Sequence, residues 1–306
     1  MKKIFVLLFL GAIMTATAKD LKVLMIGNSF SICVGRNLPQ LVAHEKKHTI
    51  DITSAYIGGC ILQRHVENLN RAEKDPSFKP YTINTWNSKN LRKKGKSKGN
   101  VNELLKNNKY DIITIQQGST ESWDYKFYQP YANELIQYIR KYNPQAEIVI
   151  QQTWAYRSDA PRLKRWKFSQ TEMSDKIITA YNELAKATNF RLIPTGEAVA
   201  IARKSPKYKY EVLSPEQLKK FTYPNLPPRT TDVVGKHFWS KNKKGVTLAA
   251  DTIHLNKHGE YMQACLWYGF LFNEDPEKIT YNPKIAAENC AILRQCAAEA
   301  LKKYQK

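Results

Sequence analysis

Short apolar runs alternate with longer amphipathic stretches along most of the chain, and this alternation constrains the fold more than any other feature. Five runs have the length and character of buried strands: residues 21–26, 49–56, 111–116, 146–152 and 190–193. Helical patterns fall between and after them, over residues 34–47, 128–142, 168–188, 258–272 and 283–304. Strands separated by helices form crossover units and pair in parallel. The sequence therefore predicts an α/β fold, a three-layer α/β/α sandwich with a central, mostly parallel five-stranded sheet.

Two segments interrupt this alternation. Residues 71–100 are polar and contain the basic run 92–98, and residues 204–244 are rich in Lys, Tyr and Pro. Unstructured loops of this length are uncommon inside a compact domain and are often functional. We interpret both as insertions, so that residues 19–306 form a single domain with insertions near 71–100 and 204–244.

The first 18 residues have the parts of a secretory signal peptide. Lys2 and Lys3 form a positive start, residues 4–13 are an apolar run too short for a permanent anchor, and residues 16–18 form a small-residue cleavage site. No Cys follows that site, and no later stretch is apolar enough to cross a membrane. We predict cleavage after Ala18, a periplasmic or secreted protein and no stable membrane anchor.

The composition is that of a globular protein with a large positive charge. Of the 306 residues 42% are hydrophobic, which excludes a disordered chain. Lys and Arg number 48 against 27 Asp and Glu, so the net charge is +21, and loss of Lys2 and Lys3 with the signal peptide lowers it to +19. The basic residues are dispersed and no nucleic-acid motif is present, which argues against a nucleic-acid partner.

The cysteine pattern predicts no disulfide framework. The five cysteines, an odd number, leave at least one free thiol: Cys33, Cys60, Cys265, Cys290 and Cys296. Cys290 and Cys296 are separated by about 9 Å along a predicted helix, too far for a mutual bridge. No Cys and His pair has the spacing of a zinc site, and the sequence implies no metal or cofactor.

Polar segments follow three of the predicted strands, at the sheet edge where parallel α/β proteins bind ligands. With a fourth segment near the C-terminus they read Gly27-Asn28-Ser29-Phe30-Ser31, Ile57-Gly58-Gly59-Cys60, Gln116-Gln117-Gly118-Ser119 and Asp251-Thr252-Ile253-His254. In this order they resemble the motifs of the SGNH hydrolase superfamily, the GDSL esterases and lipases, and in particular the SGNH-like carbohydrate esterases of polysaccharide-degrading bacteria. The resemblance covers nearly the whole chain after residue 18. It implies an SGNH/flavodoxin-like fold and a serine esterase.

Three residues are the candidate catalytic set. Ser29 at a strand-to-helix turn is the candidate nucleophile, because a helix start offers free N–H groups near an attacking hydroxyl. His254 is the candidate general base, since an imidazole can accept and return the Ser proton. Asp251 would orient the His254 ring, and in this superfamily the Asp and the His share one short loop. His258 is the alternative base.

The oxyanion of an acyl intermediate needs hydrogen-bond donors. The resemblance implies the backbone N–H groups of Ser29 and Gly59, with Gly58 as an alternative. The family's third motif carries an Asn donor, whereas this chain has Gln-Gln-Gly-Ser, as sialate and xylan acetylesterase-like relatives do. We expect Gln117 to donate in its place, with Gln116 as the alternative, since strand register decides which side chain faces the site.

A basic, aromatic segment follows the fourth predicted strand and suggests the substrate. Trp154 can stack on a sugar ring, and Arg157 and Arg162 can bind carboxylates. With the net charge of the chain, these residues favour an acidic polysaccharide such as pectin, carrying methyl or acetyl esters. A lipase-like esterase and a non-catalytic glycan-binding module on an SGNH frame are the alternatives, and the oligomeric state stays open.

Overall fold

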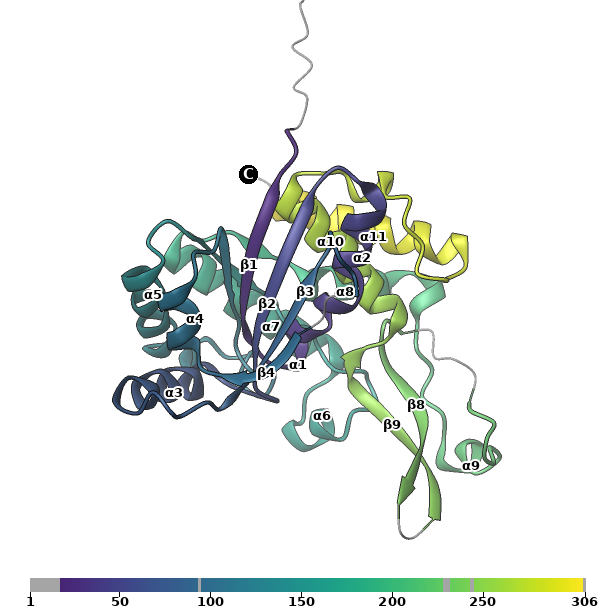
Figure 1. The fold of residues 1–306 in the computed structure, drawn as a ribbon. Coiled ribbons are helices and arrows are strands. Elements are labelled where there is room, and N and C mark those ends of the chain that lie inside the picture. Colours follow the sequence, from purple (N-terminus) through teal and green to yellow (C-terminus); the bar gives the residue numbers. More distant parts are fainter. Residues whose placement is uncertain (1–16, 93–94, 228–231, 243–244, 305–306) are drawn as a thin grey trace, which may run out of the picture.

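The computed structural model describes residues 17–92, 95–227, 232–242 and 245–304. Most of the predicted signal peptide, residues 1–16, lies outside the described residues, as do Lys93 and Lys94 of the basic run. The described chain forms three layers, with a β-sheet between two groups of helices (Figure 1).

The middle layer is a seven-stranded sheet in the order β4–β3–β2–β1–β5–β6–β7. The five predicted strands form its parallel part: β1 (Asp20–Gly27), β2 (Thr49–Tyr56), β5 (Ile112–Ile115), β6 (Glu147–Gln151) and β7 (Leu192–Ile193). Residues 23–26 of β1 are all buried, as expected of a strand covered by helices on both faces. The predicted α/β fold class, with a mostly parallel sheet between helical layers, is confirmed.

The sheet has seven strands rather than five because the predicted insertion 71–100 contributes two. β3 (Tyr81–Asn87) pairs antiparallel with β2, and β4 (Gly95–Gly99) pairs antiparallel with β3 at the edge. Lys96 and Lys98 of β4 are exposed. Charged side chains on an edge strand discourage pairing with other chains. The polarity that suggested an insertion therefore belongs to an edge hairpin of the sheet.

Helices cover both faces of the sheet (Figure 1). One group packs together through α10 and α11: α2 (Val34–Glu45), α8 (Thr195–Lys204), α10 (Lys257–Phe272) and α11 (Ala287–Tyr304). A second group consists of α3 (Leu62–Lys74), α4 (Val101–Asn107) and α5 (Tyr131–Tyr142). The longest helix, α7 (Gln170–Thr188), packs Tyr181 edge-on against Tyr128 at 5.3 Å between ring centroids. The remaining helical turns are short: α1 (Ser29–Ile32), α6 (Pro161–Trp166), α9 (Pro215–Leu218), η1 (Tyr125–Phe127), η2 (Pro206–Tyr208) and η3 (Pro276–Lys278).

The second predicted insertion, 204–244, leads into a hairpin that projects from the body (Figure 1). Its strands are β8 (Val234–Asn242) and β9 (Gly245–Leu255), which pair antiparallel as a separate two-stranded sheet. The last residues of β9 run directly into α10, so the base of the hairpin is fixed to the central layers.

A β-bulge interrupts the hairpin near its base. Val234 pairs with Leu255 and Lys236 with Asp251, so four steps along β9 match two along β8. Gly235 between them has a φ of +88°, and a Cβ there would lie 2.7 Å from the Asp251 carbonyl oxygen, so this position requires glycine. The Asp-x-x-His segment, expected in a short loop, therefore lies on a bulged strand. Bulges of this kind redirect side chains, often beside active sites.

Within the described ranges, no helix combines the length and apolar character needed to cross a membrane. All five cysteines are buried and free.

Candidate active site

Ser29 lies where β1 passes into α1. Asn28 caps the helix, accepting a hydrogen bond from the Phe30 N–H at 3.0 Å. The preceding Gly27 allows a close approach, because a Cβ there would lie 3.0 Å from Cδ of Gln116 and 2.7 Å from Oγ of Ser31. The hydroxyl of Ser29 is thus placed at the carboxyl end of a central strand, as the ligand-binding edge of such sheets requires.

The His254 ring lies within hydrogen-bond distance of both Ser29 and Asp251. Its Nε2 lies 2.9 Å from Ser29 Oγ, and its Nδ1 lies 2.8 Å from Asp251 Oδ2. The N–H groups of Ile253 and His254 donate to Asp251 Oδ1 at 2.9 and 3.0 Å, which fixes the carboxylate inside the bulge. The arrangement is that of a nucleophile, a base and a group that orients the base.

The electrostatics of Asp251 favour its charged form. Partial burial acts to raise the pKa of this carboxyl, but hydrogen bonds from the His254 ring and from the His254 and Ile253 N–H groups outweigh it. The pKa of Asp251 is therefore held well below its usual value of 3.8. An ionised Asp251 can accept a hydrogen bond from the His254 Nδ1–H group and stabilise the imidazolium that forms when His254 takes a second proton.

Asn28 ties three motif segments together, a role that the sequence reasoning missed. Its Nδ2 donates to the Cys60 carbonyl at 2.9 Å, and its Oδ1 accepts from Gln116 Nε2 at 2.6 Å. The Asp of the SGNH pattern could not donate to Cys60 when ionised. The sequence contains a signal for this role. Asn28 stands where the SGNH pattern has Asp, and Gln116 provides an amide that can donate a hydrogen bond to Asn28.

The oxyanion assignment of the two glutamines is corrected by their hydrogen bonds. Gln117 is buried, with Oε1 accepting from the Leu62 and Gly118 N–H groups at 2.9 and 2.8 Å and Nε2 donating to the Phe127 carbonyl at 2.8 Å. Gln116 donates to Asn28, as described above. Both side chains connect loops to the sheet, and the amide nitrogen of each already donates to a protein acceptor.

The backbone donors of the prediction remain available. Within the described part of the chain, the N–H groups of Ser29 and Gly59 make no hydrogen bond. Gly58 and Gly59 form an exposed turn after β2, and this turn is held beside Ser29 by the bond from Ile57 N–H to the Gly27 carbonyl at 3.3 Å. Ser29 and Gly59 are therefore the candidate oxyanion donors.

Two of the predicted substrate residues are buried and have structural roles. Trp154 packs on Phe30, with ring centroids 4.1 Å apart, and donates from Nε1 to the Ile253 carbonyl. Arg157 is fully buried and forms a bidentate ion pair with Asp159 at 2.7 and 2.8 Å. Because its charge is already paired, Arg157 is not placed to bind a substrate carboxylate. The sequence pattern could not distinguish these partners from a ligand.

Arg162 is partly exposed and lies beside the third motif. Its Nη1 donates to the Tyr156 hydroxyl at 3.2 Å, and that hydroxyl lies 2.8 Å from Ser119 Oγ. Of the three predicted substrate residues, it is the one whose position still suits contact with a ligand.

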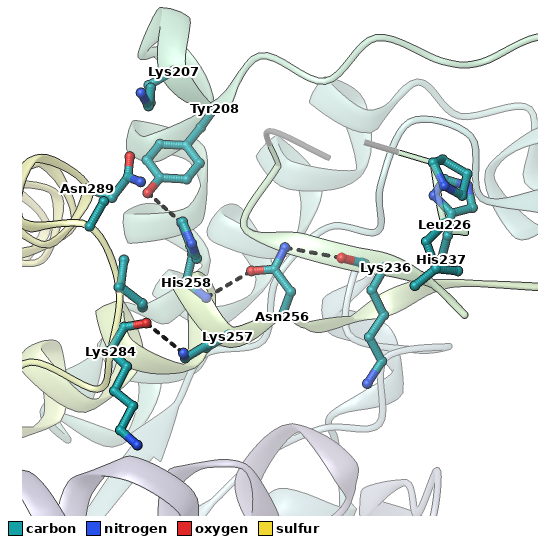
Figure 2. Close-up of a pocket in the computed structure, with 14 residues that line it drawn as sticks. Lys207, Tyr208, Leu226, Lys236, His237, Asn256, Lys257, His258, Lys284 and Asn289 are labelled. Carbon is teal, nitrogen blue, oxygen red and sulfur yellow. Dashed lines mark hydrogen bonds between the residues drawn. The ribbon is translucent and has the colours of Figure 1, made fainter. Parts of the chain in front are cut away.

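His258, the alternative base, is turned away from Ser29. Figure 2 shows it directed toward Tyr208, whose hydroxyl lies 2.9 Å from His258 Nδ1. Both residues line a cavity of about 640 Å³ at the base of the hairpin, and none of the three catalytic candidates lines it. The Lys236 side chain extends away from Asn256 in this view. Across the described ranges, no group of three or more His, Cys, Asp or Glu could hold a metal ion.

Comparison with known proteins places the chain in a family. No curated protein matches it. A crystal structure of a DUF4886 family protein from Bacteroides uniformis is similar, with 25% identity over 94% of this chain and 96% of that one and a TM-score of 0.74.

More distant solved structures include a candidate SGNH hydrolase from Slackia heliotrinireducens, at 16% identity over 80% of this chain and 95% of that one, with a TM-score of 0.47. A candidate GDSL-like lipase from Parabacteroides merdae is 13% identical over 82% of this chain and 95% of that one, with a TM-score of 0.46. Because the model of the family described as a domain of unknown function, DUF4886, matches residues 22–211, the chain belongs to the DUF4886 family.

Proposed function

We propose that this protein is an exported serine esterase that hydrolyses methyl or acetyl esters on a carbohydrate, specifically on an acidic polysaccharide such as pectin. The observation that carries the proposal is the continuous hydrogen-bond chain from Ser29 Oγ through the His254 ring to Asp251. Nucleophile, base and orienting carboxylate at these distances are what acyl transfer through a covalent intermediate needs.

In the first half of the reaction Ser29 Oγ attacks the ester carbon while its proton passes to His254 Nε2. The carbonyl oxygen becomes an oxyanion, which the N–H groups of Ser29 and Gly59 stabilise. Collapse of this intermediate breaks the bond to the alcohol, which takes the proton from His254 and leaves. The acyl group stays on Ser29.

In the second half water attacks the acyl-enzyme. His254 removes a proton from the water, a second oxyanion forms, and its collapse returns the proton to Ser29 and releases the acid. A methyl ester yields methanol first, and an acetylated sugar yields the sugar hydroxyl first.

Exposure and charge support a polymeric, acidic substrate. The His254 side chain keeps 44% of its surface exposed, so a bulky substrate can reach it. The net charge of +19 after loss of residues 1–18 would attract a polyanion over a range set by the screening length, about 8 Å at physiological salt. Arg162 beside the third motif is a candidate contact for a uronate carboxylate.

Three measurements test the proposal. The wild type should hydrolyse p-nitrophenyl acetate and should react with a fluorophosphonate at Ser29, whereas Ser29→Ala should do neither. On methylated or acetylated pectin kcat/KM should fall as salt rises, while hydrolysis of the neutral small ester should change little. Labelling at Ser31 or Ser119 would overturn the nucleophile, and equal salt dependence for both substrates would overturn the acidic substrate.

Export is part of the proposal and rests on the sequence of residues 1–18. Expressed with its own N-terminus in a Gram-negative host, the protein should accumulate in the periplasm and begin at Lys19. An uncleaved cytoplasmic product would argue against export.

A further inference from the structure

The register of the β8–β9 hairpin gives its two faces different surroundings. In an antiparallel pair, directly opposed side chains lie on the same face, and alternate residues along a strand share that face. Lys236 is opposed to Asp251 and Phe238 to Ala249. Lys236 and Phe238 therefore lie on the face that carries Asp251, and we call Lys236 and Phe238 the triad-side face.

The opposite face is covered by the preceding segment. His237 and Trp239 of β8 line a cavity of about 490 Å³ together with Leu218 of α9. The Trp239 indole N–H donates to the Asn225 carbonyl at 3.2 Å, and Tyr223 packs against the Trp239 ring. On the triad-side face, by contrast, the Phe238 ring keeps 39% of its surface exposed. Figure 1 shows the hairpin extending outward with α9 beside it.

Two basic side chains lie where the triad-side face meets the active site. Arg36 and Glu260 form an ion pair there. Burial raises the pKa of Glu260, and the charges of Arg36, Lys236 and His254 oppose that rise. Arg36 and Lys236 thus lie near the Glu260 carboxylate at the margin of the site, and Lys236 is also opposed to Asp251 across the hairpin.

We propose that the triad-side face binds the uronic-acid chain that carries the scissile ester, with Phe238 stacked on a sugar ring and Lys236 paired with a uronate carboxylate. The proposal rests on the proposed esterase function. Its support is the continuity of this face with Asp251, the exposure of Phe238 on it and the exposed Lys236 side chain at its base. Phe238 lies two residues, about 7 Å, along β8 from Lys236.

Binding and hydrolysis separate this proposal from the esterase assignment. Binding of oligogalacturonate is measured with Ser29→Ala, and with Ser29→Ala combined with Phe238→Ala, Lys236→Ala or Val246→Ala. Val246 is opposed to Lys241 on the other face and is 42% exposed, so it is a matched control for loss of exposed apolar surface on the same hairpin.

We expect Phe238→Ala to weaken binding roughly threefold to tenfold, as loss of a ring contact does. Lys236→Ala should weaken it about threefold at low salt and less at high salt. Val246→Ala should leave it unchanged. With the triad intact, Val246→Ala, which lies outside the proposed surface, should hydrolyse p-nitrophenyl acetate at the wild-type rate.

Equal affinities for the Phe238→Ala and Val246→Ala proteins, or no binding of oligogalacturonate by Ser29→Ala, would overturn the proposed surface. Failure of the wild type to hydrolyse any small ester would instead overturn the esterase function. The two failures are therefore distinct.

Discussion

The indole N–H of Trp154 donates a hydrogen bond to the carbonyl oxygen of Ile253 at 2.9 Å, one residue before His254. The same indole packs on Phe30, one residue after Ser29, at 4.1 Å between ring centroids. A single buried side chain thus contacts both the segment that carries the candidate nucleophile and the segment that carries the candidate base. The backbone N–H of Arg157 adds a bond to the Thr252 carbonyl at 2.8 Å. Residues 154–157 therefore hold the bulge of β9 against the central sheet.

Trp154→Phe should lower kcat on p-nitrophenyl acetate about tenfold with little change in KM. The variant keeps an aromatic ring against Phe30 but loses the donor to Ile253, so the His254 ring is less well positioned, and small misplacements of catalytic groups are costly. Trp166→Phe is a suitable control, because Trp166 stacks on Tyr156 outside this contact. Equal kcat values for Trp154→Phe and the wild type would contradict the positioning role.

The three catalytic candidates should behave as a unit. Ser29→Ala and His254→Ala should each lower kcat by about four to six orders of magnitude, and Asp251→Asn should cost no more than His254→Ala. The fold should be kept, which circular dichroism and the urea midpoint can check. If His258→Ala abolished activity while His254→Ala spared it, the assignment of the base would be wrong.

Gln117→Ala should destabilise the protein instead of disabling the chemistry. The change leaves two backbone N–H groups, those of Leu62 and Gly118, and the Phe127 carbonyl without partners. Unpaired buried groups cost about 1–3 kcal/mol each, so the free energy of unfolding should fall by about 3 kcal/mol. Urea unfolding measures this.

The kinetics of the same variant distinguish the structural role from a catalytic one. Loss of an oxyanion donor typically lowers kcat by about 100- to 1,000-fold. At temperatures well below the unfolding transition of Gln117→Ala, we expect its kcat to fall less than tenfold. A 100-fold fall in kcat with an unchanged free energy of unfolding would instead support Gln117 as an oxyanion donor.

The outcomes for particular residues show which features a sequence can predict. The apolar runs of β1 and β2 specify buried strands by themselves, and the four motif segments follow from where such strands end. β4 was missed because an exposed edge strand needs no apolar residues. The sequence shows that Trp154 and Gln117 follow strands, which is why it predicts them in the site. It does not show that their hydrogen-bond partners are Ile253 and Phe127, because these residues lie in other segments.

The bulge of β9 illustrates the same limit. The spacing of Asp251 and His254 is readable, but in a regular strand residues three apart point to opposite faces. The irregular pairing with β8, where four steps of β9 match two of β8, lies at this segment, and the two side chains come into contact there. Long-range pairing of this kind leaves no local pattern in the sequence.

The thiols provide a last prediction, because burial suppresses their ionisation. Burial raises the pKa of Cys33 and of Cys60 from 9.0 to about 12, and that of Cys296 to about 11. Only the thiolate reacts readily with disulfide reagents. At pH 8 the folded protein should therefore react very slowly with Ellman's reagent and keep its esterase activity. In denaturant all five thiols should titrate.

The same shifts fix the sign of a pH effect on stability. The pKa of the Cys60 thiol is higher in the folded protein than in the unfolded chain, so the native protein holds the thiol proton more tightly. The contribution of this proton to the free energy of unfolding is complete below pH 9 and is lost as the pH rises toward the folded-state pKa. The urea midpoint should therefore be lower at pH 10 than at pH 8, and replacing Cys60 with Ala should reduce that difference. Rapid labelling of Cys60 at pH 8 would contradict its burial. The Cys60 carbonyl also accepts the hydrogen bond from Asn28, next to Ser29. Modification of the Cys60 thiol should therefore disturb this bond and lower the esterase activity.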